Sequence, residues 1–409
     1  MNWSDSAEQA AFRDEVQTFV RERFPSDYLA DRSDEQSLEP EDVAGYNWIA
    51  DARSEDPARR DAAMRWAAAL AERGWVASHW PTEFGGAGLS PMEDFILQEE
   101  MMRARAPQVN GIAVNLLGPT LLEHGTQEQK REHLPRIASG EVIWAQGFSE
   151  PEAGSDLAAL RTRAVLDGDH YVVNGQKVWT SLGQYADWFF VLVRTDPEAR
   201  KHRGITFLLV DASTPGVTVR PITDIRGAAP FAEVFFEDVR VPVANRVGEE
   251  DRGWYVAMAT LDFERSGIGA TVKYRRALED LVQALRAGGD GCRLRAADPV
   301  RHEIAQRYTE MRVLYNLARY TTSVQASGAT PGYEASVNQL FSAELHQRLA
   351  RTGAKVSGEL GRLWQRDGAP LHGVFTHMRF DSVAASFLAG TSEIQRNVIA
   401  TRGLGLPRE

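Results

Sequence analysis

Residues 148–156 read Phe-Ser-Glu-Pro-Glu-Ala-Gly-Ser-Asp, and residues 179–181 read Trp-Thr-Ser. The first stretch contains proline and glycine after a β-prone run, so it predicts a turn that leaves a strand. Ser149, Ser155 and the backbone N–H groups of such a turn can donate hydrogen bonds. The second stretch ends another β-prone run, which is typical of a buried aromatic anchor beside two satisfied hydroxyl groups. Neither interpretation needs a ligand.

A third stretch, residues 387–397, reads Phe-Leu-Ala-Gly-Thr-Ser-Glu-Ile-Gln-Arg-Asn. It predicts a turn that caps a helix, with Thr391 or Ser392 as the N-cap residue. The free N–H groups at such a helix start favour anions.

The pattern of the chain changes twice. Residues 1–140 have the three- and four-residue spacing of helices, residues 141–247 contain short β-prone runs, and residues 248–409 return to the helical spacing. We expect residues 31–57, which are acidic and contain proline, to be rich in loops. Asn174-Gly175 predicts a two-residue hairpin turn between two strands. The chain is therefore expected to fold into three domains with the order helical, β, helical.

Together, the three quoted stretches resemble the flavin-binding segments of the acyl-CoA dehydrogenases. The resemblance implies an α+β protein with an N-terminal helical domain, a middle antiparallel β-barrel or sandwich and a C-terminal four-helix bundle. It also implies FAD as the cofactor, with Ser149 at the pyrimidine edge of the flavin, the Ser181 hydroxyl at N5, and Thr391 and Glu393 at the dinucleotide. The full set of implied cofactor-binding residues is Gln146, Phe148, Ser149, Gly154, Ser155, Trp179, Thr180, Ser181, Thr391 and Glu393.

The position of the residue that would remove the substrate proton is the main difference between this chain and the best-known members of the family. The best-known members of the family carry their catalytic glutamate where this chain has Ala389, immediately before Gly-Thr. A minority, including isovaleryl-CoA dehydrogenase, place it in a Leu-Asp-x-Glu-Arg run, which this chain has at residues 261–265. The resemblance therefore implies Glu264 as the base, whereas the residues alone also allow a surface glutamate paired with Arg265 or Lys273. A carboxylate at an apolar helix face would have the raised pKa of a competent base.

The implied reaction is the α,β-dehydrogenation of an acyl-CoA thioester to the trans-2-enoyl-CoA, with hydride transfer to flavin N5. Ser155, Asp262, Arg265 and Ala389 are the implied substrate-binding residues, and the backbone N–H of Ala389 would hold the thioester oxygen. Electrons would pass to an electron-transfer flavoprotein. The length and identity of the acyl group are left open.

Two motifs of homotetrameric relatives are absent. Neither Arg-x-x-Phe-Gly nor Gln-x-x-Gly-Gly occurs in the sequence. Residues 357–361 resemble the second motif only loosely. The resemblance implies a homotetramer or homodimer, with a heterotetramer as the alternative. An oxygen-using hydroxylase or oxidase of the same superfamily, and a subunit with a weak or silent site, also stay open.

Composition excludes several other classes. The net charge of −11 over 409 residues argues against non-specific nucleic-acid binding. The single cysteine, Cys292, excludes an intrachain disulfide and predicts a reducing compartment, with the cytoplasm as the expectation. The histidines have no metal-ligand spacing, and no stretch predicts a signal peptide or a membrane span. We therefore expect no metal site and no membrane contact.

Overall fold

The structure is a computed structural model, and it describes residues 4–30, 46–263, 268–287, 299–329, 331–363, 369–388 and 390–407. Its elements form two compact units. One unit combines α1, α2, α5 and every element from α9 to the C-terminus, and the other combines α3, α4 and the elements from η3 to α8. The predicted domain boundaries near residues 140 and 247 stay predictions.

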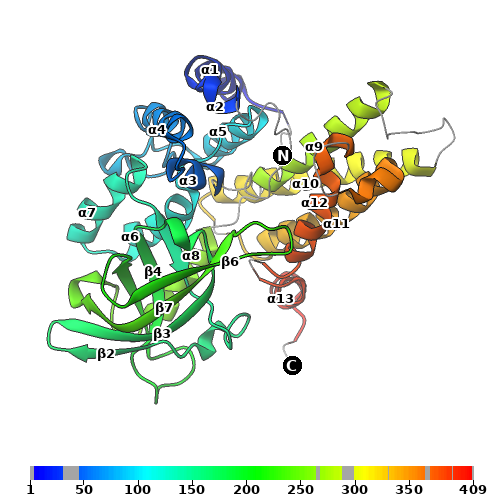
Figure 1. The fold of residues 1–409 in the computed structure, drawn as a ribbon. Coiled ribbons are helices and arrows are strands. Elements are labelled where there is room, and N and C mark those ends of the chain that lie inside the picture. Colours follow the sequence, from blue (N-terminus) through cyan, green and yellow to red (C-terminus); the bar gives the residue numbers. More distant parts are fainter. Residues whose placement is uncertain are drawn as a thin grey trace. The chain divides into compact units, whose positions relative to one another are not determined.

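The β domain is one sheet of eight strands (Figure 1). The strands are β1 Trp144–Gly147, β2 Arg163–Asp167, β3 His170–Ser181, β4 Trp188–Arg194, β5 Ile205–Asp211, β6 Val217–Ile222, β7 Phe231–Pro242 and β8 Arg246–Val247. Their order is β6-β7-β3-β2-β4-β5-β8, with β1 paired to β4. Five pairings are antiparallel, and β1 and β2 each run parallel to β4. The predicted antiparallel character is therefore confirmed for most of the sheet.

The predicted hairpin at Asn174-Gly175 is wrong, because both residues lie inside the continuous strand β3. The two-residue turn is instead Gly168-Asp169, between Asp167 and its partner His170. Asn174 faces Asp238 of β7, with two hydrogen bonds of 2.9 and 3.0 Å. Gly175 is needed for close approach, since a Cβ there would lie 2.6 Å from Thr162 Oγ1. Both residues thus serve pairing with neighbouring segments rather than chain reversal.

The same unit contains helices that come before and after the sheet in the sequence. Those before it are α3 Tyr46–Ala52, α4 Pro57–Ala71, α6 Gly118–His124 and α7 Gln127–Ala138, and the one after it is α8 Gly253–Phe263. Two short turns, η2 Thr82–Phe84 and η3 Ala113–Leu117, lie between them. Residues 31–45 of the stretch predicted to be rich in loops lie outside the described residues, and for α3 the prediction is wrong. Trp48 and Ile49 are fully buried, and the Trp48 indole donates a 2.9 Å hydrogen bond to the Ala63 carbonyl. Burial against α4 stabilises a helix that the composition of the stretch disfavours.

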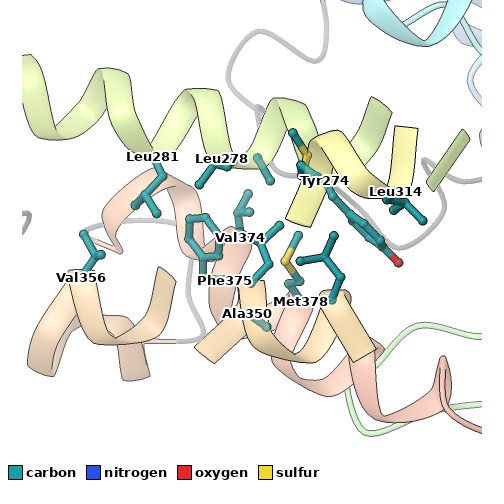
Figure 2. Close-up of a cluster of buried hydrophobic side chains, with 13 residues drawn as sticks. Tyr274, Leu278, Leu281, Leu314, Ala350, Val356, Val374, Phe375 and Met378 are labelled. Carbon is teal, nitrogen blue, oxygen red and sulfur yellow. The ribbon is translucent and has the colours of Figure 1, made fainter. Parts of the chain in front are cut away.

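The other unit is helical, with α1 Ala7–Arg23, α2 Ser26–Ala30, α5 Pro91–Arg103, α9 Ile268–Ala287, α10 Pro299–Ala326, α11 Tyr333–Ser357, α12 Val374–Ala384 and α13 Ser392–Val398. The short turns η7 Gly358–Arg362, η8 Pro370–Gly373 and η9 Ile399–Gly403 complete it. Figure 2 shows the core that α9 to α12 share, in which Leu281, Leu314 and Phe375 are buried. Arg13 of α1 pairs with the buried Glu99 and Glu100 of α5. The predicted C-terminal bundle thus corresponds to helices α9 to α12.

Candidate functional site

Aromatic packing in the core of the β domain fixes the turn that follows β1. The Phe148 ring is buried and meets Phe190 and Phe207 edge-on, with ring centroids 5.8 and 6.0 Å apart. The backbone N–H of Val178 donates a 3.0 Å hydrogen bond to the Ser149 carbonyl. Strand β3 therefore holds the start of this turn directly.

A buried ion pair joins β3 to the same turn. The Lys177 ammonium is 2.8 Å from Glu150 Oε1, and the Lys177 side chain has no exposed surface. Burial lowers the pKa of Lys177 to about 8, although the Glu150 charge opposes the change. Burial alone would raise the pKa of Glu150, but the Lys177 charge and hydrogen bonds from Thr162 and Arg161 outweigh it and hold the pKa below its usual value. The sequence interpretation missed this pair, although a lysine inside a β-prone run is a signal that a buried partner is needed.

The end of β3 presents a tryptophan to the surface. The Trp179 side chain is 58% exposed, which overturns the interpretation as a buried aromatic anchor. Its φ of 61° is in the left-handed region, and its ring meets Phe231 edge-on at 5.9 Å. The pairing of β3 with β7 shifts register between Lys177 and Thr180, so Trp179 lies on a β-bulge. A bulky residue in this conformation is typical of a functional position.

Several buried polar atoms near these strands lack a hydrogen-bond partner among the described residues. Gln146 Nε2 on β1 and Thr180 Oγ1 on β3 are buried and make no hydrogen bond to any described residue. The interpretation of satisfied hydroxyl groups is therefore wrong for Thr180, whereas Ser181 does have an interaction in the structure. Unpaired buried polar atoms are uncommon in folded proteins and call for a bound water or ligand.

The loop between β1 and β2 is open at its tip. Gly154 and Ser155 are exposed, and a Cβ at Gly154 would meet no atom within 4 Å. Lys201 Nζ lies 2.5 Å from Asp156 Oδ2 at the side of this tip. The loop thus has room for a ligand beside Ser155.

The predicted residues of the third stretch lie in the helical unit. Thr391 is the N-cap of α13 and accepts a 3.2 Å hydrogen bond from the Ile394 N–H, as predicted. Gly390 has a φ of 88°, which suits glycine, and Glu393 is exposed in the first turn. The structure therefore confirms the cap, and both Thr391 and Glu393 belong to the helical unit.

Most of the residues predicted for catalysis and substrate binding lie outside the described part of the chain. Glu264, Arg265 and Ala389 are not among the described residues, and the side chain of Asp262 is not described. Lys273, the alternative partner of Glu264, is buried with its Nζ atom 3.6 Å from Asp381 Oδ2. Within the described ranges, no three His, Cys, Asp or Glu side chains form a metal-binding group. No described helix is long and apolar enough to cross a membrane.

The three parts of the chain match the three domains of one enzyme family. Models of the acyl-CoA dehydrogenase N-terminal, middle and C-terminal domains match residues 46–141, 145–239 and 251–404. The chain belongs to the acyl-CoA dehydrogenase family. It is therefore an oxidoreductase of that family.

Named relatives of this acyl-CoA dehydrogenase include proteins of Mycobacterium tuberculosis. Acyl-CoA dehydrogenase IpdE1 of that organism is 42% identical over 84% of this chain and 88% of its own length. Among solved structures, the Tcur3481-Tcur3483 steroid ACAD is 32% identical with a TM-score of 0.85, and both chains are covered completely. The ChsE4-ChsE5 complex from Mycobacterium tuberculosis is 34% identical with a TM-score of 0.81, again over the whole of both chains.

Proposed function

We propose that this acyl-CoA dehydrogenase binds FAD and oxidises an acyl-CoA thioester to the trans-2-enoyl-CoA. Trp179 supports the flavin part of the proposal most strongly. Its indole is largely exposed on a left-handed β-bulge, in a segment that resembles the flavin-contacting Trp-Thr-Ser of the family. An exposed aromatic face held in a disfavoured conformation fits a planar ring better than it fits solvent.

The neighbouring polar groups fit the same ligand. Gln146 Nε2 and Thr180 Oγ1 are buried without hydrogen-bond partners among the described residues, so each needs a polar partner that the described part of the chain does not supply. By resemblance, Ser149 and Ser181 donate to the flavin, while Thr391 and Glu393 contact the dinucleotide. Bound FAD would supply a hydride acceptor.

We assign proton removal to Glu264. The assignment is supported by the Leu-Asp-Phe-Glu-Arg run at residues 261–265 and by the alanine at position 389, which cannot act as a base. A carboxylate can take the proton next to the thioester carbonyl while the hydride leaves the adjacent carbon. Ala389 retains a backbone N–H that can hold the thioester oxygen, and Ser155, Asp262 and Arg265 are the proposed substrate contacts.

The substrate class is inferred from the relatives. One solved relative is named a steroid ACAD, and the chain covers it completely at 32% identity. We therefore propose an acyl-CoA with a bulky, steroid-derived acyl group. Both solved relatives described above are named as pairs of different chains, which supports a second, different subunit as partner. An electron-transfer flavoprotein is the proposed electron acceptor, on the family resemblance alone.

The test is anaerobic mixing of the purified, FAD-loaded protein with a panel of linear, branched and steroid-derived acyl-CoA thioesters. We expect the flavin band to bleach with a steroid-derived thioester. Glu264→Gln should keep the bound flavin and lose the bleaching. Glu279→Gln, which removes an exposed i,i+4 ion pair with Arg275, is the matched control and should bleach normally.

Two results would contradict parts of this assignment, and a third would support the proposed heteromer. Normal bleaching in Glu264→Gln would remove Glu264 as the base. A flavoprotein that no thioester bleaches, but that consumes oxygen rapidly, would place the chain in the oxygen-using branch. A chain that binds FAD only after a second subunit is added would confirm the heteromer and show that its own site is incomplete.

A further inference from the structure

We propose that Lys177 and Glu150 act as positioning residues, and that their buried ion pair sets the relative placement of the turn 148–155 and the strand end 179–181. Both segments carry residues assigned above to FAD, so the inference rests on the proposed function. It adds two residues that touch neither the cofactor nor the substrate in that assignment.

Lys177 joins β3 to the turn. Its ammonium donates to Glu150 Oε1 at 2.8 Å and to the Phe148 carbonyl at 3.1 Å. The next residue, Val178, donates its backbone N–H to the Ser149 carbonyl at 3.0 Å. Two successive residues of β3 therefore hold three successive residues of the turn, and Trp179 follows immediately.

Glu150 closes the loop that carries Gly154 and Ser155. Its backbone N–H and carbonyl both pair with Ala153, each at 3.0 Å. Its carboxylate accepts the backbone N–H of Arg161 at 2.6 Å and that of Thr162 at 2.8 Å. One side chain thus joins the beginning of the loop, its far end and the ammonium on β3.

The β-bulge begins at the residue that this pair holds. On β3 the register advances from Lys177 to Thr180, whereas on β7 it advances only from Val234 to Ala232. The extra residue places Trp179 in the left-handed region, which a bulky side chain adopts only when its surroundings fix it. Loss of the Lys177 contacts would release the strand at the start of this bulge.

The charges around the pair give the proposal a pH signature. Besides Glu150, the charged group that acts on Lys177 is Arg194 of β4, which adds to the lowering of the Lys177 pKa to about 8 by burial. The ammonium, and with it a charge-assisted hydrogen bond to the Phe148 carbonyl, is therefore lost as the pH rises through about 8. A side chain that only filled space would show no such dependence.

The experiment uses the full-length protein and compares Lys177→Met, the double variant Lys177→Met/Glu150→Gln and the control Arg240→Met. The double variant leaves no buried charge unpaired, which is the main reason why the single variant could fail to fold. Arg240→Met breaks an exposed 2.8 Å ion pair with Asp167 in the same domain. FAD affinity is measured by titration, and amide hydrogen exchange is measured without FAD.

We expect the double variant to bind FAD about tenfold more weakly or worse, as the loss of a hydrogen bond from a charged donor implies. Amide exchange should accelerate in residues 148–155 and 179–181 and not in the rest of the sheet. The FAD affinity of the unmutated protein should fall above about pH 8, while that of the double variant stays flat. Arg240→Met should match the unmutated protein in every measurement.

Unchanged FAD affinity and unchanged exchange in the double variant would overturn the inference. A double variant that does not fold, or whose whole sheet exchanges faster, would show a structural role instead and would also overturn it. If the unmutated protein binds no FAD, the proposed function fails, but the exchange of the two segments still decides whether the pair positions them.

Discussion

The two parts of the chain that resemble flavin-binding segments are built in different ways. In the β domain, the turn 148–155 and the strand end 179–181 rest on buried Phe148 and on the fully buried Lys177. In the helical unit, α13 contributes no buried residue. It is held by its Thr391 cap and by an ion pair between Arg396 and Glu344 of α11, whose side chains are 53% and 43% exposed.

This difference separates two kinds of binding surface. The β-domain segments are fixed by the core of their own domain, so their geometry is costly to disturb. The segment around α13 depends on contacts that solvent and salt weaken. Similar sequence motifs in one enzyme can therefore differ greatly in how firmly the fold holds them.

The largest effect should come from Lys177→Met, which leaves the Glu150 carboxylate buried without its partner. We expect the free energy of unfolding to fall by about 3–5 kcal/mol, the usual cost of breaking a buried ion pair from one side. Urea denaturation at pH 7 measures it. A loss under about 1 kcal/mol would mean that the ion pair is solvated. The β-domain segments would then be held no more firmly than α13.

The second-largest effect should be the loss, at acid pH, of the stability that the same ion pair contributes. The pKa of Glu150 is held below its usual 4.5, so its contribution to stability is complete above that pH and is lost as the pH falls through the lowered value. The difference in unfolding free energy between the unmutated protein and the double variant Lys177→Met/Glu150→Gln, in which neither side chain titrates, should thus be constant from neutral pH to about 5 and narrow below 4.5. Denaturation curves at several pH values check this, and a difference that widens in acid would contradict it.

Removal of the α13 cap should have a smaller effect. Thr391→Ala deletes the acceptor of the Ile394 N–H and should destabilise α13 by about 1 kcal/mol. Amide exchange of residues 392–398 is the measurement, because the loss is local. Thr391→Ser keeps the acceptor and is the control. Equal exchange in the alanine and serine variants would show that the cap does not hold this helix.

The smallest effect should come from Arg396→Met. This change removes an ion pair of 2.6 Å between two exposed side chains, which is expected to be worth about 0–1 kcal/mol. Raising the salt concentration should reduce the difference from the unmutated protein further. A loss comparable to that of Lys177→Met would overturn the contrast between the two regions.

Sequence patterns predicted the fold where local and tertiary preferences agree. The helical spacing of residues 1–140 agrees with α1, in which Val16, Phe19 and Val20 form the buried face, and the β-prone runs of residues 141–247 agree with strands such as β4. The prediction failed at Asn174-Gly175, where a strong turn signal is used for cross-strand contacts inside β3. It also failed for α3, because the helix depends on burial of Trp48 against α4.

The site shows a similar division. Motif resemblance selected Ser149, Trp179 and Thr391, but a motif carries no information about exposure or register. The outward indole of Trp179 depends on a bulge set by the pairing of β3 with β7, which is a long-range property. The partnership of Lys177 with Glu150 spans 27 residues of sequence, so no local pattern could predict it.

The exposed indole of Trp179 also gives the protein an optical reporter of its own. Among the tryptophans that the structure describes, it is the one with a largely exposed side chain, while Trp48, Trp66, Trp80 and Trp144 are fully enclosed. Its emission should lie at longer wavelength than theirs and should be quenched selectively by iodide. A planar ligand that covers the indole would shield it from the quencher, so occupancy of this surface can be followed without a label.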